Sequence, residues 1–395
     1  MHDAIIVGAR CAGAATAMLL ARKGYKVLLV DRSRFPSDLP HGHFVHRHGP
    51  PRLARWGLLD RVLATNCPPV ASCVMDFGDF PLVADALVVD GVPLGVGPRR
   101  AALDGVLIDA AVEAGVELRT RFLVEDVIRD GNCVTGIRGR ALDGGEAVAE
   151  RASVTIGADG RRSRIAHAVG AASYDEVPTA ACWYFSYWSD VDLPGLEFYV
   201  RADRYVIAHP TNDGLVAIFV GWPIERLTGV RQDLERSFMG ALDGLTDLQA
   251  RVRCGHRVEP ICGATDLPHF YRKPCGPGWA LVGDAGCHKD PVLALGICDA
   301  LRDAELLANA LDARFSGLRD MQDALAEYEA QRNAASRQDY RQNVAMAQFR
   351  PIPQQMLSVR AAVRGNPDLS RQFVLARQGL VPWESIIANL DSAMA

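Results

Sequence analysis

The sequence predicts an α/β fold with a parallel sheet, a second and mostly antiparallel sheet, and helices towards the C-terminus. Three observations predict it. Continuous apolar runs flank a helical pattern near the N-terminus, aromatic segments with alternating polarity fill the middle, and helical patterns dominate the end. The 395 residues are 49% hydrophobic and 23% charged, which suits one large or two medium domains.

The first 31 residues predict a β-α-β unit of the Rossmann-like kind. Asp3–Val7 and Lys26–Asp31 are continuous apolar strands, as in a parallel sheet that is covered on both faces. Ala12–Lys23 is rich in Ala and Leu and reads as the intervening helix, which Gly24 ends. The unit has the length of a dinucleotide-binding motif.

The same kinds of sequence pattern predict the later strands and helices. In residues 180–266, aromatic residues cluster, polar and apolar residues alternate, and turns recur at short intervals. This region therefore predicts the antiparallel sheet, with one helix near Arg231–Leu242. The remaining elements expected are the helix Arg100–Ala114 and the strands Val116–Arg119, Phe122–Arg129, Cys133–Arg140, Ala152–Ile156 and Trp279–Val282.

Composition excludes several classes of protein. A net charge of −4 with interleaved charges argues against nucleic acid as a partner. The ten cysteines are scattered without a C-x-x-C pair, so we expect reduced and mostly buried thiols. An apolar strand close to Met1 predicts no signal peptide, and no apolar run is long enough for a transmembrane segment, so we expect a cytoplasmic protein.

The stretch IIVGARCAGAAT, from Ile5 to Thr16, approaches a G-x-G-x-x-G phosphate loop. Gly8 and Gly13 occupy the outer glycine positions, while Arg10 replaces the middle one and brings positive charge to the place of an anion. Asp31 ends the second strand, where an acid contacts a ribose hydroxyl. The order strand, helix, strand, acid favours a nucleotide-binding unit over a β-α-β unit whose turn binds no ligand.

Two later turns place an acid after a buried strand. Asp159–Gly160 lies in IGADGRRSRIA, and Gly283–Asp284 lies in LVGDAGCHKDPVLALG. Each turn alone is common in α/β proteins as a capping acid before a helix. Together with the first turn, they resemble the FAD-dependent monooxygenases of the para-hydroxybenzoate hydroxylase type, in which three such motifs occur in this order.

The resemblance covers roughly residues 1–330 and implies the domain organisation. It implies a discontinuous FAD-binding domain at 1–170 and 275–330, a substrate-binding sheet domain at 171–274, and a C-terminal helical segment at 331–395. The segment Arg99–Leu118 also matches the helix, with its preceding arginine, that lies beside the flavin in this family.

The resemblance also implies a set of FAD contacts. Gly8, Arg10 and Gly13 would surround the pyrophosphate, and Ala294–Cys298 would aim backbone N–H groups at the flavin pyrimidine edge. The other implied contacts are Asp31 and Arg32 at the adenosine, Val124 through its backbone, Arg99 (or its rival Arg100) near the ribityl phosphate, Asp159 as a brace, Asp284 at the ribityl hydroxyls, Pro291 over the ring, and Gly296 and Ile297 at the pyrimidine edge.

The sequence departs from the family pattern at two places. Arg10 replaces the middle glycine, as in a subset of the family that reads VGAR-x-AG. After Pro291, Ala294 and Leu295 replace the usual Gly and Gln, and Cys298 replaces a frequent Asn or Ser. Polar side-chain contacts to the flavin are therefore in question there, whereas backbone contacts are not.

Histidines supply the candidate catalytic groups. His43 and His46 lie in HGHFVHRHGPP, which follows the second strand, and they are candidate proton donors, acceptors or substrate anchors. Packing histidines and a metal site are the alternatives, although no carboxylates at ligand spacing support a metal. His288 lies inside the G-D turn and is expected beside the flavin, with Lys289 and Asp290 partly exposed.

The aromatic sheet predicts an apolar substrate cavity. Most of its aromatic residues should be packing, but alternation turns about half of them towards the flavin, which suits a planar or hydrophobic small-molecule substrate. The residues are Trp183, Tyr184, Phe185, Tyr187, Trp188, Phe198, Tyr199, Tyr205, Phe219 and Trp222.

The resemblance implies an FAD-dependent monooxygenase. NAD(P)H would reduce FAD transiently, and the reduced flavin would bind O2 as a C4a-hydroperoxide that hydroxylates an aromatic or polyketide-like substrate. The main alternative is a reductase of the geranylgeranyl-reductase type that saturates C=C bonds, although its Y-x-W-x-F-P signature is absent. A flavin halogenase, whose W-x-W-x-I-P segment is absent, and a non-catalytic flavin-binding protein are further alternatives.

Overall fold

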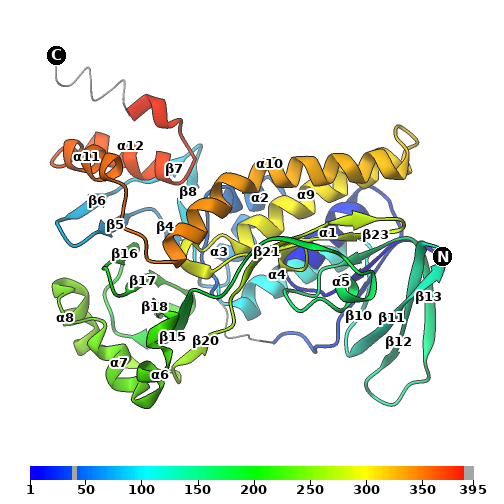
Figure 1. Cartoon of the computed structure of the whole chain (residues 1–395), viewed down its shortest axis with the longest axis horizontal. Coiled ribbons are helices and arrows are strands. Elements are labelled where there is room, and N and C mark those ends of the chain that lie inside the picture. The colour runs from blue at the N-terminus through cyan, green and yellow to red at the C-terminus, as the bar shows by residue number, and fades with distance from the viewer. Residues whose placement is uncertain (38–41, 387–395) are drawn as a thin grey trace.

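The first sheet contains the parallel strands predicted from the N-terminal unit (Figure 1). The computed structural model describes residues 1–37 and 42–386. The sheet runs β10-β2-β1-β13, and the C-terminal half of β13 also pairs in parallel with β23, while its N-terminal half pairs antiparallel with β12. The strands are β1 (His2–Val7), β2 (Val27–Val30), β10 (Glu117–Arg119), β11 (Phe122–Asp130), β12 (Cys133–Ala141), β13 (Val148–Gly157), β22 (Cys275–Gly276) and β23 (Trp279–Leu281).

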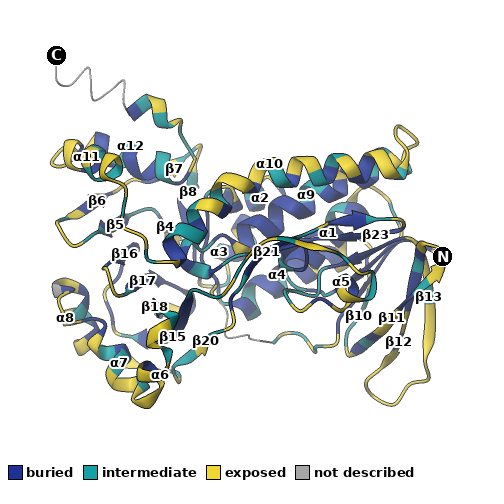
Figure 2. Ribbon diagram, in the orientation of Figure 1, coloured by how far each residue is buried: buried dark blue, intermediate teal, exposed yellow. Residues whose placement is uncertain are grey.

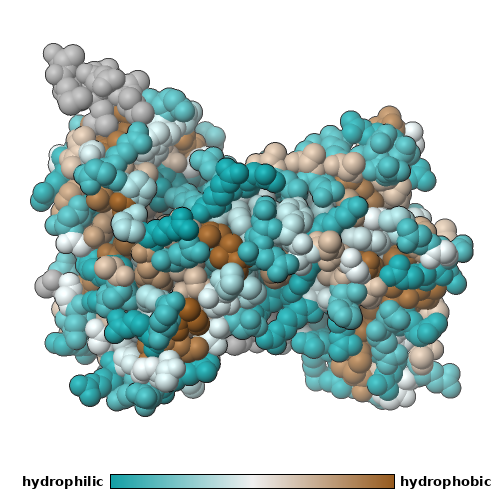
Figure 3. All heavy atoms as spheres, in the orientation of Figure 1, coloured by the Kyte–Doolittle hydropathy of each residue, from teal (hydrophilic) through white to brown (hydrophobic). Residues whose placement is uncertain are grey.

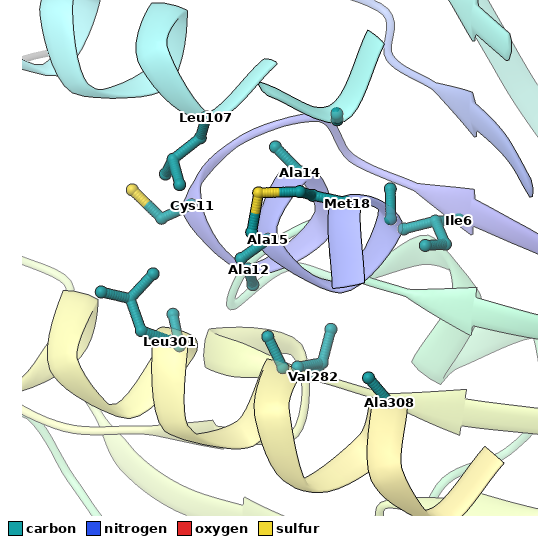
Figure 4. Close-up of a cluster of buried hydrophobic side chains, with 14 of the residues drawn as sticks. Ile6, Cys11, Ala12, Ala14, Ala15, Met18, Leu107, Val282, Leu301 and Ala308 are labelled. Carbon is teal, nitrogen blue, oxygen red and sulfur yellow. The ribbon is translucent and has the colours of Figure 1, made fainter. Parts of the chain in front are cut away.

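An alanine-rich helix forms the centre of the first core. Helix α1 (Cys11–Arg22) packs between α4 (Arg100–Glu113) and α9 (Gly296–Phe315). Figure 4 shows Ala12 and Ala15 facing Val282 and Leu301, with Met18 and Leu107 completing the cluster. Small side chains let the helices approach closely, so α1 and α9 are buried along most of their length (Figure 2).

The second sheet is mostly antiparallel, as predicted. Its order is β19-β15-β18-β17-β16-β5-β6, with β20 beside β15, and only the β16–β5 pair is parallel. Strands β5 and β6 lie outside the 171–274 segment that the sequence assigns to this sheet. The strands are β5 (Cys73–Asp76), β6 (Pro81–Ala84), β15 (Ala181–Ser189), β16 (Leu196–Val200), β17 (Tyr205–Pro210), β18 (Val216–Pro223), β19 (His256–Arg257) and β20 (Cys262–Ala264).

Three helices cover one face of the second sheet, so the prediction of a single helix near Arg231–Leu242 is wrong. They are α6 (Leu227–Gln232), α7 (Leu234–Gly240) and α8 (Thr246–Cys254). Asp233 has φ −145° and ψ 81°, and its side chain accepts a hydrogen bond from the Arg236 N–H. The extended backbone therefore ends α6, and the carboxylate caps α7.

Short elements connect the sheets. Residues 45–96 form a small sheet of β3, β9 and β4, two helices and the β7–β8 hairpin. Their bounds are β3 (Val45–His46), α2 (Gly49–Arg55), α3 (Leu59–Leu63), β4 (Pro69–Val70), β7 (Val88–Val89), β8 (Val92–Pro93) and β9 (Gly95–Val96). The others are α5 (Arg164–Ala168), β14 (Ser173–Val177), β21 (His269–Arg272), β24 (Cys287–His288) and the 3-10 helices η1 (Asn212–Gly214), η2 (Ile224–Arg226), η3 (Gly283–Ala285) and η4 (Pro291–Leu293).

The C-terminal part is helical, as predicted. Helix α10 (Met321–Ala347) lies along α9, and α11 (Gln354–Ala362) and α12 (Pro367–Arg377) pack on β5 and β6 (Figure 1). All ten cysteines are free and most are buried, which confirms that prediction.

The surface agrees with the composition. The face in Figure 3 is mainly hydrophilic, with apolar residues in small scattered groups. Among the helices that the structure describes, none combines the length and apolar character needed to cross a bilayer.

Candidate functional site

The turn from β1 into α1 is built around two glycines. Gly8 has φ +105°, and a Cβ there would lie 2.4 Å from the carbonyl oxygen of Ala158. A Cβ on Gly13 would lie 1.7 Å from the Gly8 carbonyl oxygen. Side chains at either position would push α1 away from the strand ends. The close approach places the first N–H groups of α1, which have no acceptor within the helix, at the edge of the sheet.

Arg10 has a carboxylate partner. Its Nη1 donates to Asp104 Oδ2 at 2.7 Å and its Nη2 to Ser37 Oγ at 2.9 Å. Asp104, on α4, is 1% exposed and also accepts a hydrogen bond from Arg100 Nη2 at 3.1 Å. Two guanidinium groups thus share one carboxylate, and one positive charge remains beside the N-terminus of α1. This charge suits an anion such as a pyrophosphate.

The geometry favours Arg100 over Arg99 as the cofactor-side arginine. Burial opposes the charge of Arg100, but interactions that include those with Asp104 and Asp284 hold the pKa of its guanidinium above the ordinary value. Among the described atoms, its buried Nε has no hydrogen-bond partner. Arg99 instead lies 4.5 Å over the Tyr187 ring and donates to Glu259, towards the second sheet.

Asp31 fixes the first turn from the end of β2. Its two oxygens accept hydrogen bonds from the backbone N–H groups of Ala9 and Ser33, both at 2.7 Å. Arg32 is exposed, and the Val124 side chain is buried in β11. The roles of Asp31, Arg32 and Val124 at the adenosine stay predictions.

The other two acid-containing turns differ in what their acids do. Asp159 accepts hydrogen bonds from the Ser163 hydroxyl at 2.5 Å and the Arg164 N–H at 2.7 Å, so it braces the turn before α5. Burial raises the pKa of the Asp159 carboxyl. Asp284 is half-buried in η3.

The three turns meet at α1. A Cβ on Gly283, which has φ +62°, would lie 2.8 Å from the Ala12 Cβ. Ala158, directly before Asp159, touches Gly8 from the other side. Segments more than a hundred residues apart in the chain therefore surround the first turn of one helix, as the sequence leads us to expect.

The loop between β24 and α9 faces the second sheet. Asp290 is 2% exposed, and its Oδ1 accepts hydrogen bonds from Trp183 Nε1 at 3.0 Å and the Val292 N–H at 2.9 Å. Burial raises the pKa of Asp290 to about 7. The expectation of partial exposure is wrong for Asp290, whereas Lys289 is intermediate in exposure, with its side chain 4% exposed and paired with Asp299.

The same loop ends at the N-terminus of a long helix. Pro291 opens η4, and Ala294 is left-handed, with φ 49° and ψ 35°. Gly296 begins α9, and Ile297 is buried. The backbone N–H groups of this first turn are available for the predicted flavin contacts, which stay predictions.

His46 holds this loop from the side of β3. Its Nε2 lies 2.9 Å from the Leu293 carbonyl oxygen, and its Nδ1 lies 2.6 Å from the side-chain oxygen of Gln378. The Cys298 thiol donates to the His46 carbonyl oxygen at 3.0 Å, so it faces the protein. His46 is a structural bridge in this geometry rather than a group with a free nitrogen.

His43 lies in an aromatic cluster between the two sheets. Its Nδ1 contacts the Gly97 carbonyl oxygen at 3.1 Å and its Nε2 the Tyr187 hydroxyl at 3.0 Å. A carbonyl can only accept, so Nδ1 carries the proton, and Tyr187 donates to Nε2. The His209 ring is 5.0 Å away, with its buried Nε2 unpartnered among the described atoms. Burial holds the pKa of His43 well below its usual range and lowers that of His209 to about 4.

His288 is placed differently from the other two histidines. Its Nδ1 contacts the Pro268 carbonyl oxygen, and its ring stacks on Phe270. These contacts join β24 to β21 and do not bring His288 to the His43 cluster. Its catalytic role stays a prediction.

The second sheet turns an apolar row towards the η4 loop. Phe198, Ile207 and Phe219 are cross-strand neighbours in β16, β17 and β18, and each is only partly buried. They pack with Val292 and Leu293 of the loop. The opposite face, with Tyr184, Trp188, Tyr199 and Trp222, packs on α6–α8, so the predicted alternation is confirmed.

Sequence reasoning missed several residues of this region. The sequence pattern places Tyr187 in the aromatic sheet and Asp104 in the helix Arg100–Ala114 but indicates no role for either, and it gives no signal for His209. Asp299 and Arg302, one turn apart on α9, form a buried ion pair at 2.6 Å beneath the loop. Charged residues in a helix rich in Ala and Leu are the one signal that could have indicated it. The described residues contain no group of three or more His, Cys, Asp or Glu that could hold a metal.

Comparisons with known proteins agree with this geometry. The profile of the family described as FAD binding domain matches residues 1–239. Digeranylgeranylglycerophospholipid reductase 1 of Methanococcoides burtonii is 27% identical over 321 residues, covering 79% of this chain and 74% of that protein. The digeranylgeranylglycerophospholipid reductase of Methanosarcina mazei is 26% identical over 325 residues, covering 78% and 74%.

Solved structures share the fold. A myxobacterial chondrochloren halogenase has a TM-score of 0.80 at 21% identity, covering 97% of this chain and 91% of its own. The p-nitrophenol 4-monooxygenase of Pseudomonas putida has a TM-score of 0.80 at 19% identity, covering 96% and 98%. The family match, which spans more than half of the chain, shows that the protein belongs to the FAD binding domain family and is an FAD-dependent oxidoreductase.

Proposed function

We propose that the protein is an FAD-dependent reductase that saturates a carbon–carbon double bond in an apolar, isoprenoid-like substrate. The apolar row of Phe198, Ile207 and Phe219 beside the η4 loop is the observation that carries the substrate class. The named reductase relatives, which match more than three quarters of this chain, support reduction over oxygenation.

The residues present fit FAD. No side chain fits at Gly8 or Gly13, so a pyrophosphate can approach the backbone there. The buried Nε of Arg100 has no hydrogen-bond partner among the described atoms and would donate to the cofactor. Gly8, Arg10, Gly13, Asp31, Arg100 and Asp284 are the residues that we propose hold the cofactor. When bound, FAD supplies hydride transfer, and NAD(P)H is the proposed transient electron donor.

Reduction of a double bond also needs a proton on the second carbon. Tyr187 is the proposed source, because its hydroxyl lies on the face of the second sheet that carries the apolar row and is held by His43 Nε2 at 3.0 Å. The guanidinium of Arg99, 4.5 Å from the ring, favours a developing phenolate. In the resting geometry this hydroxyl donates to His43 Nε2, so to protonate the substrate it would turn its hydrogen from that nitrogen to the substrate carbon.

A specific observation favours aromatic hydroxylation as a second candidate function. His209 Nδ1 lies 3.0 Å from the Pro210 carbonyl oxygen, so it carries the proton, and the unpartnered Nε2 is an acceptor. A phenolic substrate would donate its hydroxyl to this nitrogen. The solved monooxygenase and halogenase structures support the shared fold only.

The test compares products from one preparation. The purified protein should carry flavin absorbance or take up FAD when it is added. Reduced anaerobically, it should then convert a lipid with geranylgeranyl chains to a product heavier by about 2 mass units per bond. Oxygen-dependent gain of about 16 mass units on a phenol, with substrate-stimulated NAD(P)H oxidation, would establish the second candidate instead. A colourless protein that cannot be reconstituted contradicts both.

A further inference from the structure

We propose that Gln378, at the C-terminal end of α12, is a positioning residue for the loop of residues 290–297. It acts on the loop through His46, although 332 residues separate the two side chains in the chain. The inference rests on the proposed placement of the flavin at this loop. It adds a part for the C-terminal helices, which the family match at residues 1–239 does not include.

Two hydrogen bonds form the connection. His46 and Gln378 are both 6% exposed, so water does not compete for their polar atoms. The His46 ring contacts Leu293 of the loop at 2.9 Å through Nε2 and Gln378 at 2.6 Å through Nδ1. The imidazole is thus held at both nitrogens, one towards the loop and one towards α12.

The protonation of the ring explains why an amide is suited to this place. Burial lowers the pKa of His46 to about 4, so the ring is neutral near pH 7 and carries one N–H. That N–H belongs on Nε2, because the Leu293 carbonyl can only accept. Nδ1 then needs a donor, and the Gln378 amide supplies one when its NH2 group turns to the ring.

The loop needs such support at Ala294. This residue adopts φ 49°, a left-handed conformation that disfavours residues with a Cβ, while its N–H donates to the Pro291 carbonyl oxygen at 2.7 Å. The bond from His46 fixes the Leu293 carbonyl, which belongs to the peptide group that leads into Ala294. The orientation of that group sets the path into Gly296, where α9 begins.

Gln378 is itself anchored to the second sheet. Phe373 of α12 is fully buried in a cluster with Met75 of β5 and Leu82 of β6. On the neighbouring helix, Arg360 is fully buried and pairs with Asp79, in the turn between β5 and β6. The position of α12 is therefore set by the second sheet, and Gln378 transmits that position to the loop.

The experiment replaces Gln378 with Leu and measures the dissociation constant of FAD, the flavin reduction potential and the thermal unfolding of the apoprotein. We expect FAD binding to weaken about tenfold, because His46 loses a buried partner and no longer fixes the loop. The reduction potential should shift as well. Gln355→Leu, the same change at an exposed position of α11, should leave all three quantities unchanged.

Two further variants separate positioning from stability. Phe373→Leu should lower the unfolding temperature while changing the potential much less than Gln378→Leu does, because it loosens α12 but keeps the bond to His46. In Gln378→Glu the bond to Nδ1 needs one extra proton, on the carboxyl or on the ring, so FAD affinity should return towards the wild-type value as the pH falls. If Gln378→Leu fails to fold, Gln378→Asn, which is too short for the 2.6 Å contact, gives the same comparison.

The outcomes are distinct. Wild-type affinity and potential in Gln378→Leu, with only a lower unfolding temperature as in Phe373→Leu, would overturn the positioning role. Failure of the wild-type protein to bind FAD would instead overturn the proposed function, and it would be seen before any variant is made.

Discussion

The two sheets contribute to the candidate site by different means. At the turns beside the first sheet, chains touch directly: Cβ atoms added at Gly8 and Gly13 would lie 2.4 and 1.7 Å from backbone carbonyl oxygens, and one at Gly283 would lie 2.8 Å from the Ala12 Cβ. In the second sheet, side chains reach across, from Trp183 to Asp290 and from Tyr187 to His43. One part of the site is thus determined by steric fit and the other by hydrogen bonds.

This difference decides how each part responds to substitution. A backbone contact tolerates no added atom, because neither partner has a rotamer with which to move away. The loss of a side-chain hydrogen bond costs less stability, since one partner is removed but the packing around it remains. The comparison predicts large effects at the turns and graded effects on the second sheet.

The largest effect is expected for Gly13→Ala. The new methyl group would lie 1.7 Å from the Gly8 carbonyl oxygen, so α1 must shift, and we expect a loss of about 5 kcal/mol in stability together with FAD binding. Denaturant unfolding and flavin absorbance measure the two losses.

Gly105→Ala provides the matched control in α4. No atom lies within 4 Å of an added Cβ there, and alanine favours helix, so stability should rise by about 0.5–1 kcal/mol. Equal behaviour of the two variants would show that steric fit does not determine the turn.

An intermediate effect is expected for Asp290→Asn, which probes the link between the sheets. Burial raises the folded pKa of Asp290 from 3.8 to about 7, so its contribution to stability is full below pH 4 and is lost as the pH rises to about 7. Asparagine does not ionise. The variant should therefore gain stability relative to wild type across this range, by about 4 kcal/mol at most.

Denaturant unfolding of both proteins at several pH values between about 4 and 8 measures this difference. Above the folded pKa, the difference should be constant. A difference that does not change with pH would mean that Asp290 ionises freely, and that the loop is open to water.

The contrast between the sheets also explains what the sequence could predict. Close backbone contacts leave glycines at fixed spacing, so Gly8, Gly13 and Gly283 indicated the converging turns and the first sheet. The alternation of residues along the aromatic strands indicated the two faces of the second sheet. The sequence shows no comparable pattern for a side-chain contact between Trp183 and Asp290, which are 107 positions apart.

Three features could not be predicted from the sequence, for related reasons. Strands β5 and β6 join the second sheet from an earlier part of the chain, and pairing between distant strands has no local signal. Arg10 was expected at the pyrophosphate, but nothing in the sequence indicated its carboxylate partner, Asp104 of α4. The bridge from His46 to Gln378 exists only once α12 has packed on β6.

The smallest effect is expected on the second sheet, where one strand offers a comparison of its two faces. Tyr187→Phe leaves His43 Nε2 buried without a donor, which should cost about 1 kcal/mol and slow turnover about tenfold if Tyr187 delivers the proton. Tyr184→Phe removes a hydroxyl that accepts from Arg231 at 3.1 Å on the helix-covered face, and turnover should not change. Unfolding and steady-state rates measure both variants. Equal slowing would mean that rigidity of β15, rather than the Tyr187–His43 pair, controls the reaction, whereas slowing confined to Tyr187 assigns the chemistry to the face that carries the apolar row.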